Sequence, residues 1–282
     1  MAGAGVDVFE TEPATDSPLF GLDNVVCTPH LGASTSEAQE NVALQVAEQM
    51  ADYLVQGAVS NALNMPSISA EEAPILTPYV KLAEILGSFA GQLTEEPIKE
   101  VEILFDGSPA GMNTRALVAA ALAGLLKPQM QSVNMVSAPL MAKERGIAVS
   151  EVRRDKTGVF DGYVQLTVKT EKQSRSVAGT CFSDGKPRFI QIKGINMEAD
   201  VGSHMLYTAN KDIPGVIGEL GMTFGRKGIN IANFHLGRDH EGGNAIALLY
   251  LDGPLSEEFL DEVRALKAVS YTHLRAHETK AN

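Results

Sequence analysis

Two short segments near the N-terminus carry side chains that could transfer a proton. His30 lies just beyond an apolar run at residues 25–28, and Glu12 lies just beyond another at residues 4–9. Ligands of open α/β sheets bind at the carboxyl ends of the strands, so these two side chains could meet there. A neighbouring carboxylate fixes the tautomer of an imidazole and raises its pKa, which suits it to acid–base catalysis. Alternatively, Glu12 is an exposed turn residue and His30 is a polar cap on a strand.

The two apolar runs are expected to be buried parallel strands. Such strands need neighbours, and nothing in the sequence precedes the first of them. We therefore expect this end of the chain to be loosely folded and to expose apolar side chains. The side chains concerned are Val6, Val8, Val25 and Val26.

A long helix is predicted after His30. Ser34 or Ser36 would cap it, apolar residues recur at helical spacing, and Gly57 would end it. Residues 57–78 contain several Pro, Ser and Ala residues, a composition that marks a connection between domains.

The rest of the chain divides into a mixed segment and a compact final segment. The mixed segment is predicted to contain helices at 78–93, 114–126 and 135–146 and strands at 98–106, 162–170, 174–182 and 187–192. The final segment is predicted to contain strands at 204–208, 230–236 and 244–251 and helices at 214–228 and 256–266. This order is the split βαβ pattern of ferredoxin-like domains without its last strand. Residues 270–282 have the character of translated adapter sequence foreign to the domain.

Composition excludes several classes of function. The chain has 282 residues, 44% of them hydrophobic, and a net charge of −12. This charge repels nucleic acid and anionic lipid surfaces, so neither is an expected partner. No apolar run approaches the roughly 20 residues that a membrane-spanning helix needs, and no secretory signal is readable. The two cysteines, Cys27 and Cys181, indicate reduced thiols and a cytoplasmic protein.

The N-terminal motifs resemble a known family. Gly-Val-Asp-Val-Phe-x-x-Glu-Pro, followed by Thr-Pro-His-Leu-Gly-Ala-Ser-Thr, resembles the D-isomer-specific 2-hydroxyacid dehydrogenases. The downstream chain narrows the resemblance to the long-form D-3-phosphoglycerate dehydrogenases. It extends over nearly the whole chain, to about Ala268.

The resemblance implies a reaction and assigns roles. His30 would be the catalytic acid–base group and Glu12 its orienting partner. The cofactor would be NAD, with Asp7, His30, Leu31, Gly32 and Ala33 against its nicotinamide end. The reaction would oxidise 3-phosphoglycerate to 3-phosphohydroxypyruvate, the first step of L-serine biosynthesis.

The sequence departs from the family in what it lacks. The substrate-binding half, the Gly-x-Gly-x-x-Gly turn and the arginine that holds the substrate carboxylate are all missing from these residues. We therefore expect a C-terminal fragment that does not turn over alone. The alternative is a regulatory and oligomerisation module without catalysis, for example of the serine dehydratase type. Glu12 and His30 argue against that alternative, because such a module does not need them.

A second set of polar residues lies in the final segment. Pattern alone is explained by helix capping, with Asp212 as N-cap, Pro214 in the first turn and Gly228 as C-terminal cap. The segment also resembles an ACT domain, an amino-acid-sensing module whose effector in this family is L-serine. By that resemblance Asp212 and Asn230, with Asn210, would hold the ammonium and carboxylate groups of serine across a pair of ACT domains.

These observations predict an α/β and α+β multidomain chain. We expect a Rossmann-type remnant at 1–34, a crossover helix and linker at 35–66, an intervening domain at 67–200, an ACT domain at 201–269 and a non-native tail at 270–282. Homo-oligomers are expected through the ACT and intervening domains. No metal site is expected, because His273 and His277 have no third ligand near them.

Overall fold

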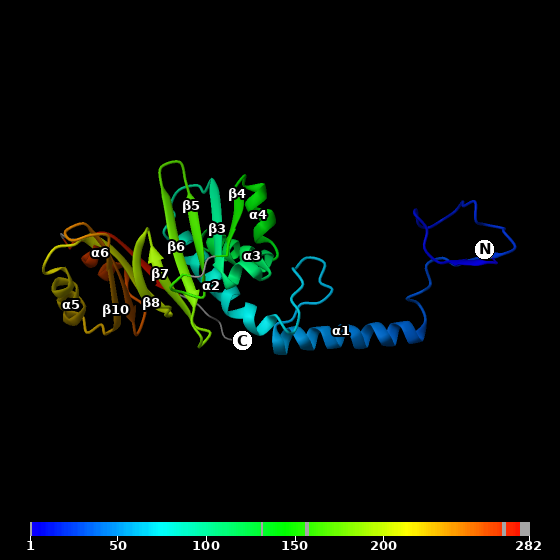
Figure 1. The fold of residues 1–282 in the computed structure, drawn as a ribbon, viewed down its shortest axis with the longest axis horizontal. Coiled ribbons are helices and arrows are strands. Elements are labelled where there is room, and N and C mark those ends of the chain that lie inside the picture. The colour runs from blue at the N-terminus through cyan, green and yellow to red at the C-terminus, as the bar shows by residue number, and fades with distance from the viewer. Residues whose placement is uncertain (1, 131, 156–157, 267–268, 277–282) are drawn as a thin grey trace.

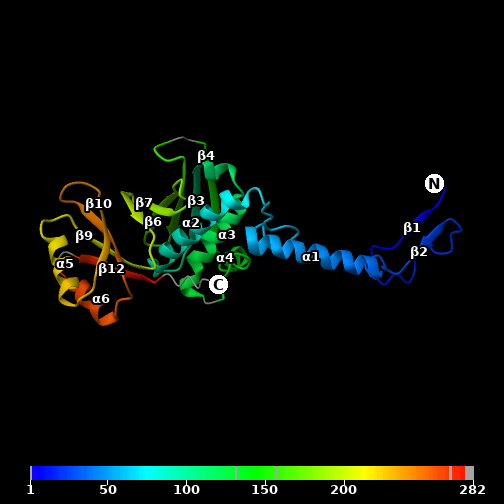
Figure 2. The same cartoon turned by 90° about the horizontal axis from the view of Figure 1, so that it is seen from below.

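The computed structural model describes residues 2–130, 132–155, 158–266 and 269–276, with the backbone alone over 270–276. The molecule is elongated and has three parts in chain order (Figure 1, Figure 2). A small N-terminal lobe lies at one end, a sheet-and-helix domain lies in the middle, and a second such domain lies at the other end. Helix α1 (Ser36–Gln56) separates the lobe from the central domain and has no buried residue.

The N-terminal lobe is built on two short strands. β1 (Ala4–Val6) and β2 (Val25–Cys27) pair in parallel, which confirms both predicted strands but makes the first shorter than expected. Val8 and Val26 are 59% and 69% exposed, as predicted, because the lobe has no layer to cover them, whereas Val6 and Val25 are half-buried. Thr35, not Ser34 or Ser36, caps α1, since its hydroxyl accepts from the Ala38 N–H.

The central domain is a six-stranded sheet in the order β4-β3-β5-β6-β7-β8. Its strands are β3 (Glu100–Gly107), β4 (Ala148–Arg154), β5 (Gly162–Lys169), β6 (Ser174–Cys181), β7 (Pro187–Ile192) and β8 (Ile195–Asp200). Its helices are α2 (Ala73–Gln92), α3 (Thr114–Leu126) and α4 (Ala138–Glu144), with 3-10 turns at Ser108–Gly111 and Lys127–Gln129. α2 and α3 pack closely against each other, and α2 also packs on β5, β6 and β7.

Three features of the central domain differ from the prediction. α2 begins at Ala73, because Pro74 occupies its first turn and Pro78 is accommodated inside it. β4 was not predicted, since its residues are almost all exposed and show no alternation. β8 was not predicted either, although its burial alternates.

The C-terminal domain is a four-stranded sheet in the order β10-β11-β9-β12, with two helices. Its elements are β9 (His204–Lys211), α5 (Val216–Arg226), β10 (Ile231–Arg238), β11 (Asn244–Leu251), α6 (Glu257–Arg264) and β12 (Val269–Ala276). β12 pairs antiparallel with β9 and completes the ferredoxin-like pattern. The prediction that the closing strand is missing was therefore wrong. The remaining tail residues, 277–282, lie outside the described residues.

The central and C-terminal domains share one apolar core. The Phe89 ring on α2 lies 5.0 Å from the Phe189 ring and 5.6 Å from the Tyr207 ring of β9. Gly237 of β10 lies against the backbone of Asn196 in β8, where a Cβ atom would come within 2.7 Å of the carbonyl oxygen. The two domains therefore contact each other through side chains that are largely removed from water. Within the described ranges, no helix is both long and apolar enough to cross a bilayer.

Candidate functional site

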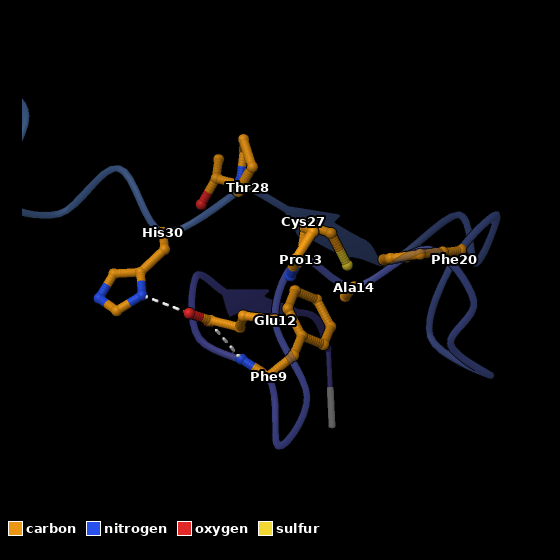
Figure 3. Close-up of a pocket in the computed structure, with 9 residues that line it drawn as sticks. Phe9, Glu12, Pro13, Ala14, Phe20, Cys27, Thr28 and His30 are labelled. Atoms are coloured by element: carbon orange, nitrogen blue, oxygen red, sulfur yellow. Dashed lines mark hydrogen bonds and ion pairs between the residues drawn. The ribbon is translucent and has the colours of Figure 1, made fainter.

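The structure brings the two predicted catalytic side chains into contact (Figure 3). His30 Nδ1 lies 2.6 Å from Glu12 Oε2, a hydrogen-bonded ion pair. His30 follows the end of β2, and Glu12 lies in the loop that follows β1. The second oxygen of Glu12 accepts the Phe9 N–H at 3.0 Å. Glu12 is therefore held in place by the backbone of its own loop.

The contact shifts the pKa values of His30 and Glu12 in opposite directions. The hydrogen bond that His30 donates to Glu12, reinforced by the carboxylate charge, raises the pKa of His30. The same hydrogen bond, with that from the Phe9 N–H, lowers the pKa of Glu12. The His30 side chain is 56% exposed, so Nε2 remains available to a ligand while Nδ1 is held by Glu12. This arrangement suits an imidazole that takes up and returns a proton through Nε2.

Asp7 fixes the loop that carries His30. One carboxylate oxygen accepts the Thr28 hydroxyl and the Leu31 N–H (2.7 Å), and the other accepts the Gly32 N–H (2.7 Å). These bonds, that from Thr28 first, lower the pKa of Asp7. The His30 N–H also donates to the Asp7 carbonyl, and His30 has a left-handed backbone with φ 55°. The carboxylate thus points at the loop backbone, an arrangement that the sequence alone did not reveal.

A cavity of about 500 Å³ opens beside the pair. Glu12, Thr28 and His30 supply its polar side (Figure 3). Its apolar lining is Phe9, Pro13, Ala14, Phe20, Cys27 and Pro29. The described lining contains no Lys or Arg, so beside the acid–base pair the cavity can bind a neutral group but offers no permanently charged side chain to a phosphate.

The loop that the resemblance places against NAD is exposed, and no phosphate-binding turn lies beside it within the described lobe. His30, Leu31, Gly32 and Ala33 form an exposed loop at the end of β2. A Cβ atom at Gly32 would lie 3.0 Å from the Asp7 carboxylate, so glycine lets the loop pack tightly there. Among the described residues of the lobe, no glycine-rich turn leads directly into a helix N-terminus. These residues would therefore hold at most one end of a dinucleotide.

The residues predicted to bind an effector lie at two ends of the C-terminal sheet. Asn210 and Asp212 are at the end of β9, whereas Asn230 precedes β10. β9 and β10 both pair antiparallel with β11, so they run parallel to each other, and these ends are opposite. Asn230 Nδ2 instead donates to Asp252 at 2.7 Å. One copy of the domain therefore does not bring all three side chains together.

The helix-capping explanation of Asp212 was wrong. α5 begins at Val216, and the residue before it is Gly215, with φ 97°. Asp212 instead accepts from the Arg238 guanidinium at 2.8 Å and from the Gly242 N–H at 3.1 Å, and these bonds lower its pKa. Arg238 was missed because nothing local in the sequence links it to Asp212.

Two segments of the chain match known family profiles. Residues 1–32 match the sequence profile described as the NAD binding domain of D-isomer specific 2-hydroxyacid dehydrogenases. Residues 75–193 match the profile described as the D-3-phosphoglycerate dehydrogenase intervening domain. A D-3-phosphoglycerate dehydrogenase of Bacillus subtilis is 37% identical over 264 residues, which is 93% of this chain and 50% of the relative. This chain is related to the D-3-phosphoglycerate dehydrogenases.

Further relatives of the same name show how widely the similarity extends. The D-3-phosphoglycerate dehydrogenase of Synechocystis is 37% identical, over 95% of this chain and 49% of the relative. That of Archaeoglobus fulgidus is 36% identical, over 95% of this chain and 52% of the relative. The chain thus spans about half the length of the D-3-phosphoglycerate dehydrogenases that it matches. The segment that carries Glu12 and His30 corresponds to part of their NAD-binding domain.

Proposed function

We propose that this chain is a C-terminal part of an NAD-dependent D-3-phosphoglycerate dehydrogenase. The reaction would oxidise 3-phosphoglycerate to 3-phosphohydroxypyruvate, the first step toward L-serine. The single observation that supports it most is the 2.6 Å contact between His30 and Glu12 inside the segment that matches an NAD-binding domain. The free thiols of Cys27 and Cys181 suit a reducing, cytoplasmic setting.

The acid–base pair would move the proton of the reaction. His30 Nε2 accepts the proton of the substrate hydroxyl, while Nδ1 stays bonded to Glu12. The resulting imidazolium is stabilised by the Glu12 carboxylate. NAD+ would supply the chemistry of accepting the hydride from the substrate carbon that carries this hydroxyl. In the reverse direction, His30 returns the proton to the carbonyl oxygen.

We further propose that the chain does not turn over alone. The described cavity lining offers no Lys or Arg for the phosphate and carboxylate of the substrate, and the chain spans half the length of its relatives. The test has two arms, both followed by NADH absorbance. The chain alone, with 3-phosphoglycerate and NAD+, should give no signal. A chimera in which this chain replaces the corresponding half of the Bacillus subtilis relative should be active.

The chimera also tests the catalytic pair. His30→Gln should lower kcat by about 10²–10⁴, the usual contribution of a general acid–base group. Glu12→Gln should lower it less, because the imidazole remains. A Glu10→Gln variant, in the same loop but without a contact to His30, is the matched control. Turnover by the isolated chain, or a His30→Gln chimera of full activity, would contradict the proposal.

A second proposed function is the binding of L-serine by the C-terminal domain, acting as an ACT domain. It is supported by the ferredoxin-like sheet and by the polar side chains at both of its ends. Because Asn230 and Asp212 lie at opposite ends, a complete site would require two copies, so we propose a homo-oligomer. Calorimetry of the chain with L-serine should show saturable binding. Light scattering should show more than one copy per particle; a monomer or an absence of heat would count against this function.

A further inference from the structure

A row of side chains crosses the end of the C-terminal sheet beside Asp212. Arg238 of β10 lies opposite Ala245 of β11, and Ala245 lies opposite Asn210 of β9. Directly paired residues of neighbouring strands share a face of the sheet. Leu206 has the same parity as Asn210 on β9 and packs in the core beneath α5 and α6, so this row lies on the helix-covered face. Ala245, which lies between Arg238 and Asn210, is small and only 1% exposed.

Arg238 and Asp212 form a pair of opposite charges at the rim of this row. Their atoms lie 2.8 Å apart, and the side chains are 54% and 21% exposed. An ion pair in contact with water contributes little to stability, so a ligand could separate it at small cost. The arginine side chain is long and has solvent around it, so the guanidinium can swing away from Asp212 without disturbing the core.

On the same face, β9 carries two buried polar atoms without hydrogen-bond partners. Asn210 is 5% exposed, its Nδ2 donates to the Lys211 carbonyl, and its Oδ1 has no hydrogen-bond partner. Thr208, two residues earlier on the same face, is 0% exposed, and its hydroxyl also has no partner. Buried polar atoms of folded proteins are nearly always hydrogen-bonded. The unsatisfied amide oxygen of Asn210, two residues before the Asp212 carboxylate, therefore points to a ligand that donates hydrogen bonds and carries positive charge.

We propose that Arg238 is a ligand-binding residue that takes the carboxylate of an α-amino acid. On binding, Arg238 leaves Asp212 and grips the α-carboxylate through its planar fork of N–H donors. Asp212, freed from the guanidinium, and Asn210 Oδ1 then accept the hydrogen bonds of the ammonium group. The ion pair seen without ligand is the closed form of a site for a zwitterion. This inference rests on the proposed amino-acid binding of the C-terminal domain and adds the residue that recognises the carboxylate.

The test compares ligands that lack one charge or the other. Calorimetry uses the whole chain with L-serine, with L-serinamide, which lacks the carboxylate, and with 3-hydroxypropionate, which lacks the ammonium group. The unmutated chain should bind L-serine at least about tenfold more tightly than either analogue. Arg238→Gln should weaken L-serine binding about tenfold or more and leave L-serinamide binding within about twofold. The affinity of Arg238→Lys for L-serine should fall between those of the unmutated chain and Arg238→Gln, because lysine keeps the charge but loses the planar fork of donors.

The matched control is Arg226→Gln, which removes an exposed arginine at the far end of α5. It should bind all three ligands as the unmutated chain does. An Arg238→Gln variant that keeps the preference for L-serine over L-serinamide would overturn the assignment and leave amino-acid binding intact. An unmutated chain that binds no L-serine would overturn the proposed effector function itself, so the two failures are distinguishable.

Discussion

The crossing of α2 and α3 gives the most direct test of the fold. Gly124 of α3 faces α2 so closely that a Cβ atom would lie 2.1 Å from the Glu84 carbonyl oxygen and 2.8 Å from the Ser88 nitrogen. Gly87 and Gly91 of α2 face α3 in the same way. The obstructing atoms are backbone, which cannot rotate aside as a side chain can. Gly124→Ala therefore requires the helices to separate.

The size of the effect follows from that geometry. Ordinary contacts of a Cβ atom begin near 3.4 Å, so the helices must move apart by about 1.3 Å. Overfilling a packed core typically costs about 1–3 kcal/mol, and the upper end applies because Leu82, Leu86 and Leu117 on these helices are fully buried. Replacing glycine by alanine inside a helix recovers roughly 0.5–1 kcal/mol. We therefore expect a net loss of about 2 kcal/mol, or roughly 4–8 °C in Tm for a domain of this size.

Thermal unfolding followed by circular dichroism measures this loss. Gly221→Ala is the matched control, because Gly221 lies in the middle of α5 with no atom near its would-be Cβ. The control should gain roughly 0.5–1 kcal/mol from the same change of residue. A Gly124→Ala variant whose Tm is unchanged, or rises with that of Gly221→Ala, would refute the close crossing.

Three further predictions concern single side chains. Glu12→Gln should return the pKa of His30 toward its ordinary value of 6.5, as followed by NMR titration of the imidazole. Because the pKa of His30 is raised in the folded protein, the contribution of the pair to stability is full below pH 6.5 and is lost as the pH rises through the raised pKa. A His30 titration that is unchanged in Glu12→Gln would contradict the contact. Phe89→Ala should destabilise the protein by about 3–5 kcal/mol in denaturant unfolding, since the ring is buried between two domains; a loss below 1 kcal/mol would contradict their shared core. Burial raises the pKa of Cys181 to about 12, so a thiol reagent at pH 8 should label Cys27 before Cys181. Mass spectrometry would measure the two labelling rates, and equal rates would contradict the protection of Cys181 by burial.

Sequence patterns predicted the elements whose burial is periodic. The helix at Thr114–Leu126 and the strand at Asn244–Leu251 have the predicted bounds, because each has a sustained apolar pattern. β4 lacks such a pattern, since it is an edge strand with little buried surface. β8 follows a two-residue turn, Lys193–Gly194, in which both residues have positive φ. Such turns favour Asn-Gly, so a turn with lysine in the first position was not recognised as a hairpin from the sequence.

The part of the candidate site that could be predicted is the part that depends on strand pairing. Glu12 and His30 both follow the ends of paired parallel strands, so topology alone places them at one edge. The hydrogen bonds of Asp7 to the His30 loop required coordinates, because they depend on where one carboxylate turns. The partner of Asp212 depends on β10 bringing Arg238 beside it, across 26 residues of sequence. Local capping rules therefore suggested the wrong role for Asp212.

The two ends of the chain maintain their sites by different physical means. In the N-terminal lobe Val8 and Val26 are exposed, so hydrogen bonds that Glu12 and Asp7 accept from loop backbone, rather than burial, hold the geometry around His30. In the C-terminal domain a packed core fixes the strands, and Arg238 is paired with Asp212 at their exposed edge. Under the proposal above, this arginine would move on rigid strands when a ligand binds. A lobe held by a few charged hydrogen bonds instead suits a site that is completed by further protein packed against its valines.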